Sequence, residues 1–254
     1  MSGLSVYGLQ GRVAVVTGAA RGIGATISRH LAALGATVVL ADRNATVEET
    51  ARELGSPASA LVFDVTDSKA VDAAAKQVLD KHGRVDILVA NAGIAYEKSA
   101  VDHTDEDWRR VMAVNLDGVF YTARAFAPAM IAKKTGAMVL ISSIAGVKAV
   151  RPELHVGYDV AKAGVAHMAR ILAIEWAPFG IRVNAVGPGY VDTELLAEVG
   201  RTQPEVMKIW IEDMPIGRLL RQEEIAGTVG FLVSDAATGV NGHLLMTDGG
   251  YSVS

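Results

Sequence analysis

Seven short runs of apolar residues recur along the 254-residue chain, and within them apolar residues do not alternate with polar ones. Strands of a parallel sheet show this pattern, because burial of both faces removes the polar half of the alternation. The chain therefore predicts seven buried parallel strands, at residues 13–18, 37–42, 60–65, 86–91, 137–142, 181–187 and 243–249.

Segments with helical periodicity lie between these runs. Residues 23–35 end at Gly35, a residue type that commonly terminates helices. In residues 104–132, Asp105 to Asp107 favour a helix start, and apolar residues then recur every three or four positions. Alternating strands and helices with short connections predict one α/β domain, residues 1–254, with a doubly wound (Rossmann) sheet of seven parallel strands flanked by helices.

Residues 193–221 do not fit this alternation. They fall between the sixth strand and the last helix, beyond the carboxyl end of a strand, where open α/β sheets bind ligands. Two interpretations remain open: the segment packs on the protein body or at a subunit interface, or it forms a substrate lid. It carries a short apolar stripe, Met207, Trp210, Ile211 and Met214.

Composition narrows the class of protein. Half of the residues are apolar, as in globular proteins, and a formal net charge of −4 offers no basic surface for nucleic acid or membrane. The absence of cysteine excludes disulfides and thiolate-bound metals and fits a reducing compartment. The start lacks the features of a signal peptide, and no apolar run is long enough to span a membrane. We therefore expect a cytoplasmic protein that binds neither nucleic acid nor membranes and has no metal site.

TGAARGIG, residues 17–24, follows the first predicted strand and opens the first predicted helix. Gly18, Gly22 and Gly24 let the backbone turn tightly and approach a diphosphate, and the helix N-terminus supplies free N–H groups. A glycine-rich turn alone is weak support, but the order of strand, turn and helix favours a dinucleotide site.

Asp42 ends the second predicted strand, 18 residues after Gly24. A carboxylate there can accept hydrogen bonds from the ribose hydroxyls of NAD and would repel the 2′-phosphate of NADP. The neighbouring Arg43 could instead pair with that phosphate, so NADP remains a less favoured alternative.

HVGYDVAKAG, residues 155–164, places Tyr158 one helical turn before Lys162. A free tyrosine has a pKa of about 10, so it needs its phenolate stabilised to act as a base at neutral pH. A lysine on the same helix face favours the phenolate. The pair is therefore a candidate for acid–base catalysis.

Further motifs follow in order: Asp64-Val65, Asn91-Ala92-Gly93, Asn115 in VNLDG, Ser142-Ser143, Tyr158 with Lys162, and PGYVDT at 188–193. With TGAARGIG, this ordered set resembles the short-chain dehydrogenase/reductase family over nearly the whole chain. The resemblance implies a catalytic tetrad of Asn115, Ser143, Tyr158 and Lys162. It also implies a cofactor site formed by Gly18, Arg21, Gly22, Ile23, Gly24, Asp42, Asp64, Val65, Asn91, Gly93, Tyr158, Lys162, Val191 and Thr193.

In this interpretation Tyr158 is the general acid/base and Lys162 lowers the pKa of Tyr158 while bonding the nicotinamide ribose. Ser143 orients the substrate oxygen, and Asn115 holds a water that relays the proton. Each of these residues also has a purely structural explanation, such as a strand-end cap for Ser143.

The chain is most similar to bacterial polyol and secondary-alcohol dehydrogenases of the family, which implies hydride transfer between NAD(H) and a small alcohol or ketone. Ser143, His155 and Tyr158 are the candidate substrate-binding residues, although His155 and Glu153 are equally consistent with a solvated loop. Two other functions remain open: an NADPH-dependent 3-oxoacyl-thioester reductase and a non-catalytic dinucleotide sensor. The resemblance also implies a homo-oligomer, with a tetramer favoured.

Overall fold

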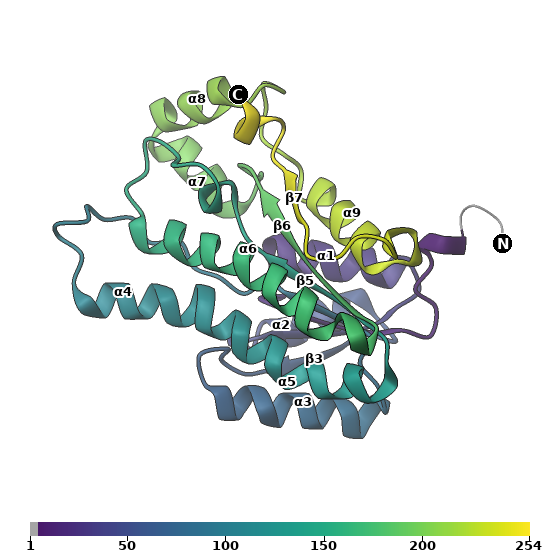
Figure 1. The fold of residues 1–254 in the computed structure, drawn as a ribbon. Coiled ribbons are helices and arrows are strands. Elements are labelled where there is room, and N and C mark those ends of the chain that lie inside the picture. The colour runs from purple at the N-terminus through teal and green to yellow at the C-terminus, as the bar shows by residue number, and fades with distance from the viewer. Residues whose placement is uncertain (1–4) are drawn as a thin grey trace.

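The computed structural model describes residues 5–254 and contains the predicted seven-stranded parallel sheet (Figure 1). Neighbouring strands pair in the order β3-β2-β1-β4-β5-β6-β7, so the chain reverses its direction of travel across the sheet between β3 and β4. This topology leaves a switch point between β1 and β4, where doubly wound sheets bind ligands. The strands are β1 Val13–Thr17, β2 Thr37–Asp42, β3 Ser59–Val62, β4 Ile87–Ala90, β5 Gly136–Ile141, β6 Ile181–Pro188 and β7 Leu244–Thr247.

Helices cover both faces of the sheet (Figure 1). Successive residues of a strand point to opposite faces. Ala14 and Val16 of β1 therefore pack with α1, α2 and α9, whereas Val13 and Val15 pack on the side of α3, α5 and α6. The helices are α1 Gly22–Ala33, α2 Val47–Leu54, α3 Ser68–His82, α4 Asp105–Met112, α5 Gly118–Lys133, α6 Val156–Trp176, α7 Glu194–Thr202, α8 Pro204–Asp213 and α9 Gln222–Val233.

The two outer strands are less buried than their apolar sequences predict. The residues of β1 and β4 are all buried, whereas those of β7 are all half-buried and those of β3 are half-buried or exposed. An outer strand has a neighbour on one side only. The expectation of full two-sided burial is therefore wrong for β3 and β7.

Two helix boundaries follow their sequence signals. Helix α1 ends just before Gly35, which has φ +99°, a conformation that favours glycine. Helix α4 starts with a capping box, in which the Thr104 side chain accepts from Asp107 N and the Asp107 carboxylate accepts from Thr104 N. The predicted helix start at Asp105 to Asp107 is confirmed.

Residues 193–221 form helices α7 and α8, which project beyond the carboxyl end of β6 (Figure 1). Trp210 is 5% exposed and stacks on Tyr190, with ring centroids 4.7 Å apart. Met214 is buried in a small cluster with Ile144 and Tyr251. Two residues of the predicted apolar stripe, Trp210 and Met214, therefore pack onto the body of the protein.

None of the helices formed by residues 5–254 is both long enough and apolar enough to cross a membrane.

Candidate active site

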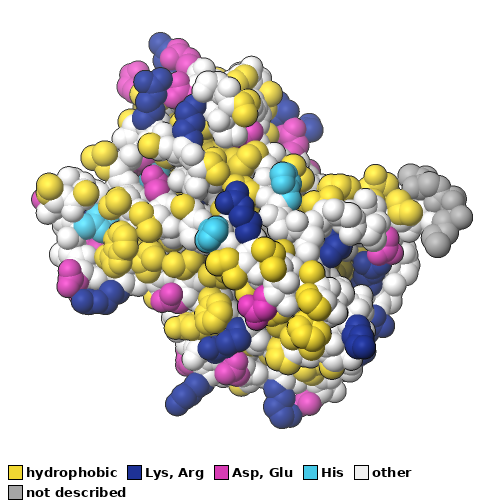
Figure 2. All heavy atoms as spheres, in the orientation of Figure 1, with side chains coloured by type: hydrophobic (Ala, Val, Ile, Leu, Met, Phe, Trp, Pro, Cys, Tyr) yellow, Lys and Arg dark blue, Asp and Glu magenta, His cyan; other side chains and the backbone are white. Residues whose placement is uncertain are grey.

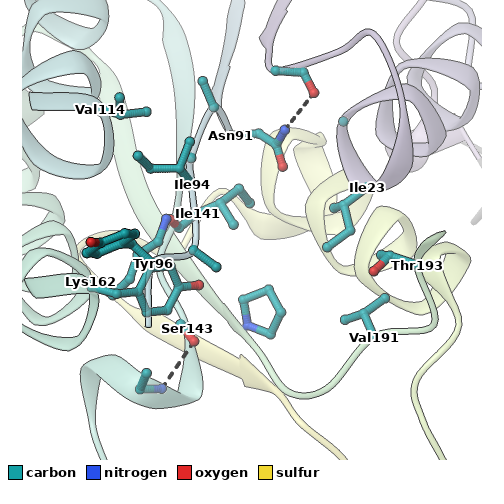
Figure 3. Close-up of a pocket in the computed structure, with 18 of the residues that line it drawn as sticks. Ile23, Asn91, Ile94, Tyr96, Val114, Ile141, Ser143, Lys162, Val191 and Thr193 are labelled. Carbon is teal, nitrogen blue, oxygen red and sulfur yellow. Dashed lines mark hydrogen bonds between the residues drawn. The ribbon is translucent and has the colours of Figure 1, made fainter. Parts of the chain in front are cut away.

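A pocket of about 720 Å³ opens at the carboxyl ends of β1, β2, β4, β5 and β6 (Figure 3). One end is lined by the glycine turn after β1 and by Asp42 at the end of β2. The other end is lined by Ser143 after β5 and by Tyr158 and Lys162 of α6. In Figure 3, Val191 and Thr193 lie across the pocket from Ser143 and Lys162.

The glycine turn needs glycine for two physical reasons. Gly18 and Gly22 have φ of +66° and +58°, which other residue types adopt only with strain. A Cβ at Gly24 would collide with the carbonyl oxygen of Gly18, so α1 packs against the turn only without a side chain there. Arg21, at the N-cap of α1, makes no side-chain capping bond. The helix N-terminus therefore keeps donors for an anion, and the turn fits a dinucleotide diphosphate.

Asn91 holds this turn in place from the end of β4. Its Nδ2 donates to the carbonyl oxygens of Thr17, at 2.9 Å, and Gly18, at 3.1 Å (Figure 3 draws one of these two contacts). Asn91 and Gly93 both line the pocket. The Asn91 side chain therefore fixes the backbone that faces the diphosphate position.

Two aspartates line the end of the pocket beside the glycine turn. Oδ2 of Asp42 accepts from Ala20 N at 3.1 Å, and Oδ1 accepts from Asn44 N at 2.9 Å. Asp64 accepts from the backbone and hydroxyl of Thr66, at 2.9 and 2.8 Å. Both carboxylates are held in fixed positions as acceptors, which fits the hydroxyl and amino donors of an adenosine group.

Ser142 and Ser143 have different environments. Oγ of Ser142 is buried and donates to the carbonyl oxygen of Lys162 at 2.7 Å. Oγ of Ser143 accepts from Ala145 N at 3.1 Å, and the hydroxyl is also hydrogen-bonded to Tyr158 (the Ala145 contact is drawn in Figure 3). Ser143 is therefore the serine whose hydroxyl lies beside that of Tyr158.

Lys162 is nearly enclosed by protein, with 3% of its surface exposed. Its Nζ donates to the carbonyl oxygen of Ile141 at 2.9 Å and lies 5.6 Å from the centroid of the Tyr158 ring. Burial lowers the pKa of Lys162 to about 8. The lysine thus lies close to the tyrosine, as predicted from their spacing on one helix face.

Tyr158 lies beside Ser143 and Asp159, and its surroundings act on its pKa in opposite directions. Burial raises the pKa of Tyr158; the hydrogen bond to Ser143 opposes this rise, and the negative charge of Asp159 adds to it. Desolvation disfavours the phenolate. The expected lowering of the Tyr158 pKa by Lys162 stays a prediction.

Asn115 is completely buried and does not line the pocket. It lies in a π-helical turn, Ala113–Asp117, between α4 and α5. Its Nδ2 donates to Ile94 O at 2.9 Å and Val111 O at 3.1 Å, and its Oδ1 accepts from Ile94 N at 3.0 Å. Asn115 thus fixes the loop after β4, and Ile94 of that loop does line the pocket.

The structure brings most of the predicted site residues to one pocket. Gly22 and Asn115 are the two that do not line it, because Gly22 shapes the turn and Asn115 lies behind the loop it holds. The lining residues among those predicted are Gly18, Arg21, Ile23, Gly24, Asp42, Asp64, Val65, Asn91, Gly93, Ser143, His155, Tyr158, Lys162, Val191 and Thr193.

The pocket is also lined by residues that were not predicted as site residues, among them Tyr96, Glu97, Tyr190 and Trp210. Tyr190 lies inside PGYVDT, directly before Val191, which was assigned to the cofactor, and Trp210 belongs to the apolar stripe of residues 193–221. Their place in these segments was a usable signal. Tyr96 and Glu97 come from a loop without regular structure, and nothing in the sequence distinguishes them.

Among the described residues, no cluster of three or more His, Asp or Glu side chains could hold a metal ion.

Similar proteins are dehydrogenases and reductases, which is the class of enzyme that this pocket suggests. A family profile described as enoyl-(acyl carrier protein) reductase matches residues 18–252. The chain is 44% identical to a galactitol 2-dehydrogenase (L-tagatose-forming) from Cereibacter sphaeroides, over 98% of both proteins. The crystal structure of gox2181 is similar with a TM-score of 0.96 and 40% identity, over 99% of both chains.

A second solved structure is similar over 99% of both chains, with a TM-score of 0.93 and 35% identity. It is a gluconate 5-dehydrogenase from Burkholderia cenocepacia J2315 in complex with NADP and tartrate. Together with the ordered motifs and the pocket, these similarities show that the chain is an oxidoreductase of the short-chain dehydrogenase/reductase family.

Proposed function

We propose that this chain is an NAD-dependent dehydrogenase that oxidises a secondary alcohol of a polyol or diol, or reduces the corresponding ketone. The observation that carries the proposal is one pocket with two ends. Ser143, Tyr158 and Lys162 meet at one end, and the glycine turn and Asp42 form the other. An alcohol and a dinucleotide bound in this pocket would meet beside the Tyr158 hydroxyl.

The tyrosine hydroxyl is the group that moves the proton. A dinucleotide held by the glycine turn, Asp42 and Lys162 would supply the hydride acceptor for the carbinol carbon during alcohol oxidation. The phenolate oxygen of Tyr158 takes the hydroxyl proton of the substrate and becomes the neutral hydroxyl, while Ser143 Oγ fixes the same substrate oxygen. Lys162, held by Ile141 O, places its positive charge beside the phenolate.

Asn115 acts on this chemistry through the loop that it holds. Its three hydrogen bonds to Ile94 and Val111 use both amide hydrogens of its side chain. The carbonyl oxygen Oδ1 retains a second lone pair for a water molecule. We therefore keep the proton-relay role of Asn115 as part of the proposal, together with its role in positioning the loop.

Asp42 supports NAD as the cofactor. Two backbone N–H groups hold its carboxylate at the pocket surface, where it can accept from both hydroxyls of an adenosine ribose. A 2′-phosphate in the same place would meet like charge. Arg43 also lines this end, and the similar gluconate 5-dehydrogenase was solved with NADP, so NADP is the alternative that a direct comparison must test.

A polyhydroxy substrate is supported by the polar lining beyond Ser143 and by the likeness to galactitol 2-dehydrogenase. Tyr96, Glu97, Glu153 and His155 line this end and offer several hydrogen-bonding groups. Helices α7 and α8 close the same end through Leu196, Val199 and Trp210, which supports a lid role for residues 193–221.

A homo-oligomer is supported by apolar side chains exposed on α4, α5 and α6, and the tetramer stays an expectation from the family resemblance. Figure 2 shows hydrophobic side chains gathered over the band where these helices run. Ile174 is 79% exposed and Ile171 51% exposed. Exposed apolar surface of this kind commonly marks a protein interface. The other members are Trp108, Phe120, Val156 and Val160.

Replacement of Tyr158 by phenylalanine tests the acid–base assignment. Tyr158→Phe removes one hydroxyl and should lower kcat for alcohol oxidation by about 10²- to 10⁴-fold, the usual contribution of a general acid or base. NADH binding, measured by fluorescence titration, should stay within about threefold. Tyr7→Phe makes the same change at a tyrosine outside the pocket and should leave both unchanged. Retained turnover in Tyr158→Phe would sink the assignment.

A further inference from the structure

The substrate end of the pocket gathers carboxylates around His155. Nδ1 of His155 lies 2.6 Å from a carboxylate oxygen of Asp159, one helical turn further along the chain. Burial lowers the pKa of His155, but Asp159, Glu153 and Glu97 together raise it above its ordinary value. The His155 side chain is 11% exposed and lines the pocket, as do Glu97 and Glu153. A single imidazole is thus set among three acidic groups.

Backbone contacts hold the two glutamates in this arrangement. Lys98 N donates to Leu154 O at 2.7 Å, which ties the loop that carries Glu97 to the loop that carries Glu153. The Tyr190 hydroxyl also donates to Glu153 at 3.2 Å. The acidic groups are therefore built into two joined loops at this end of the pocket.

A lysine and an arginine of the same loops form ion pairs with aspartates outside the pocket. Lys98 is ion-paired with Asp107 at 2.8 Å, and Arg151 is ion-paired with Asp213 at 3.0 Å. Neither Lys98 nor Arg151 lines the pocket. Among the described residues that line this end, the basic side chains are His155 and the buried catalytic lysine. The charge that a substrate meets beyond the reacting carbon is therefore negative.

We propose that His155, held by Asp159 and flanked by Glu97 and Glu153, forms a subsite that binds a hydroxyl of an uncharged polyol and excludes substrates with a carboxylate. With Nδ1 turned to Asp159, Nε2 is the ring nitrogen that can bond a substrate hydroxyl. Glutamate carboxylates can accept from further hydroxyls. A carboxylate on the substrate would meet like charges in a site partly shielded from water, where repulsion is strong. This inference rests on the proposed function and specifies its substrate class.

The test compares two substrates with the same carbon skeleton, galactitol and galactonate. The wild-type enzyme should have a kcat/KM at least about 100-fold higher for galactitol. The double variant Glu97→Gln/Glu153→Gln removes both negative charges and keeps acceptors of the same shape. It should lower the galactitol-to-galactonate ratio at least about tenfold. Glu106→Gln/Glu205→Gln removes two charges from exposed positions outside the pocket and should leave the ratio unchanged.

A measurement on the wild-type enzyme needs no substitution. Raising ionic strength from about 0.02 to 0.3 M screens like-charge repulsion, and should raise kcat/KM for galactonate at least about threefold. The value for galactitol should change by less than about twofold, because an uncharged substrate meets no such repulsion.

Asp159→Asn tests the positioning of His155. An amide keeps the shape but loses the charge that fixes the ring, so KM for galactitol should rise about three- to tenfold while KM for NAD changes less than about twofold. Equal loss of kcat and KM for both ligands would assign Asp159 a merely structural role.

Two results distinguish failure of the subsite proposal from failure of the proposed function. Turnover of galactitol with a galactonate ratio that stays within about twofold in Glu97→Gln/Glu153→Gln would overturn the subsite and leave the proposed function intact. No turnover of either substrate with either cofactor, in an enzyme that binds NADH, would overturn the proposed function and the subsite together.

Discussion

The two ends of the pocket differ in whether backbone or side chains form most of their surface. The cofactor end consists mainly of backbone: glycines at the turn after β1, and carboxylates held by backbone N–H groups. The substrate end consists of side chains from three loops and from α6, α7 and α8. Close approach of the backbone to a diphosphate requires glycine at fixed positions of the cofactor end. The side chains of the substrate end can differ from one enzyme to another as the substrate differs.

The largest effect should come from the backbone end. A methyl group at Gly24 would collide with the carbonyl of Gly18, which side-chain movement cannot relieve. Gly24→Ala should therefore lower the free energy of unfolding by about 1–3 kcal/mol and weaken NADH binding at least about 100-fold. Thermal unfolding and fluorescence titration measure the two effects.

Gly227 of α9 is the matched control for that change. Nothing lies within 4 Å of a Cβ placed there. Gly227→Ala should raise the free energy of unfolding by about 0.5–1 kcal/mol, since alanine is the better helix former, and should leave NADH binding unchanged. Equal behaviour of the two alanine variants would contradict the packing argument for Gly24.

The next largest effect should fall on cofactor choice. Asp42→Ala removes the acceptor held by Ala20 N and Asn44 N, so the ratio of kcat/KM for NAD over NADP should fall at least about tenfold. Steady-state rates with both cofactors measure the ratio. Asp67→Ala, at the exposed N-cap of α3, tests for a general effect of losing a carboxylate. An unchanged ratio in Asp42→Ala would remove the support for NAD.

The pH dependence should differ between the two reaction directions. The pKa of Tyr158 is raised, so its phenolate is scarce at neutral pH, and kcat/KM for alcohol oxidation should increase with pH by up to about tenfold per unit. The rise should flatten above about 8, where Lys162 loses its charge. Ketone reduction uses protonated Tyr158 and should not rise over the same range. A fall in oxidation rate between pH 6 and 8 would contradict this assignment.

The smallest effect should come from the side chains that choose the substrate. His155→Ala removes one hydrogen-bonding group and should lower the preference for polyols over simple secondary alcohols about three- to tenfold. His167→Ala, on an exposed face of the same helix, should leave the preference unchanged. Rates on a matched panel of alcohols decide the point, and an unaltered preference in His155→Ala would return His155 to a structural role.

The parts of the fold that could be predicted from the sequence are those that depend on local patterns of residues. The seven strands could be predicted because each is a run of apolar residues that do not alternate with polar ones. Asp42 could be singled out because it ends one of these runs. The exposure of β3 and β7 could not, because an apolar run does not show which strand lies at an edge.

Site residues could be predicted where a short stretch of sequence determines how they lie relative to one another. Tyr158 and Lys162 lie on one helix face, so their spacing was enough to pair them. The π-helical turn at Asn115 has no pattern of its own in the sequence. The charge of Glu97 acts on His155 from another loop, which a hydrogen bond from Lys98 N to Leu154 O joins to the loop of Glu153, and the raised pKa of Tyr158 depends on burial by the whole fold.

The most direct test of the central claim follows the hydride itself. The wild-type enzyme would be incubated with NAD and a polyol that carries deuterium at the carbinol carbon, and the NADH formed would be analysed by mass spectrometry. The account predicts NADH that contains one deuterium, formed by the wild-type enzyme and, at a rate lower by about 10²-fold or more, by Tyr158→Phe. NADH without deuterium, or equal rates in the two proteins, would contradict it.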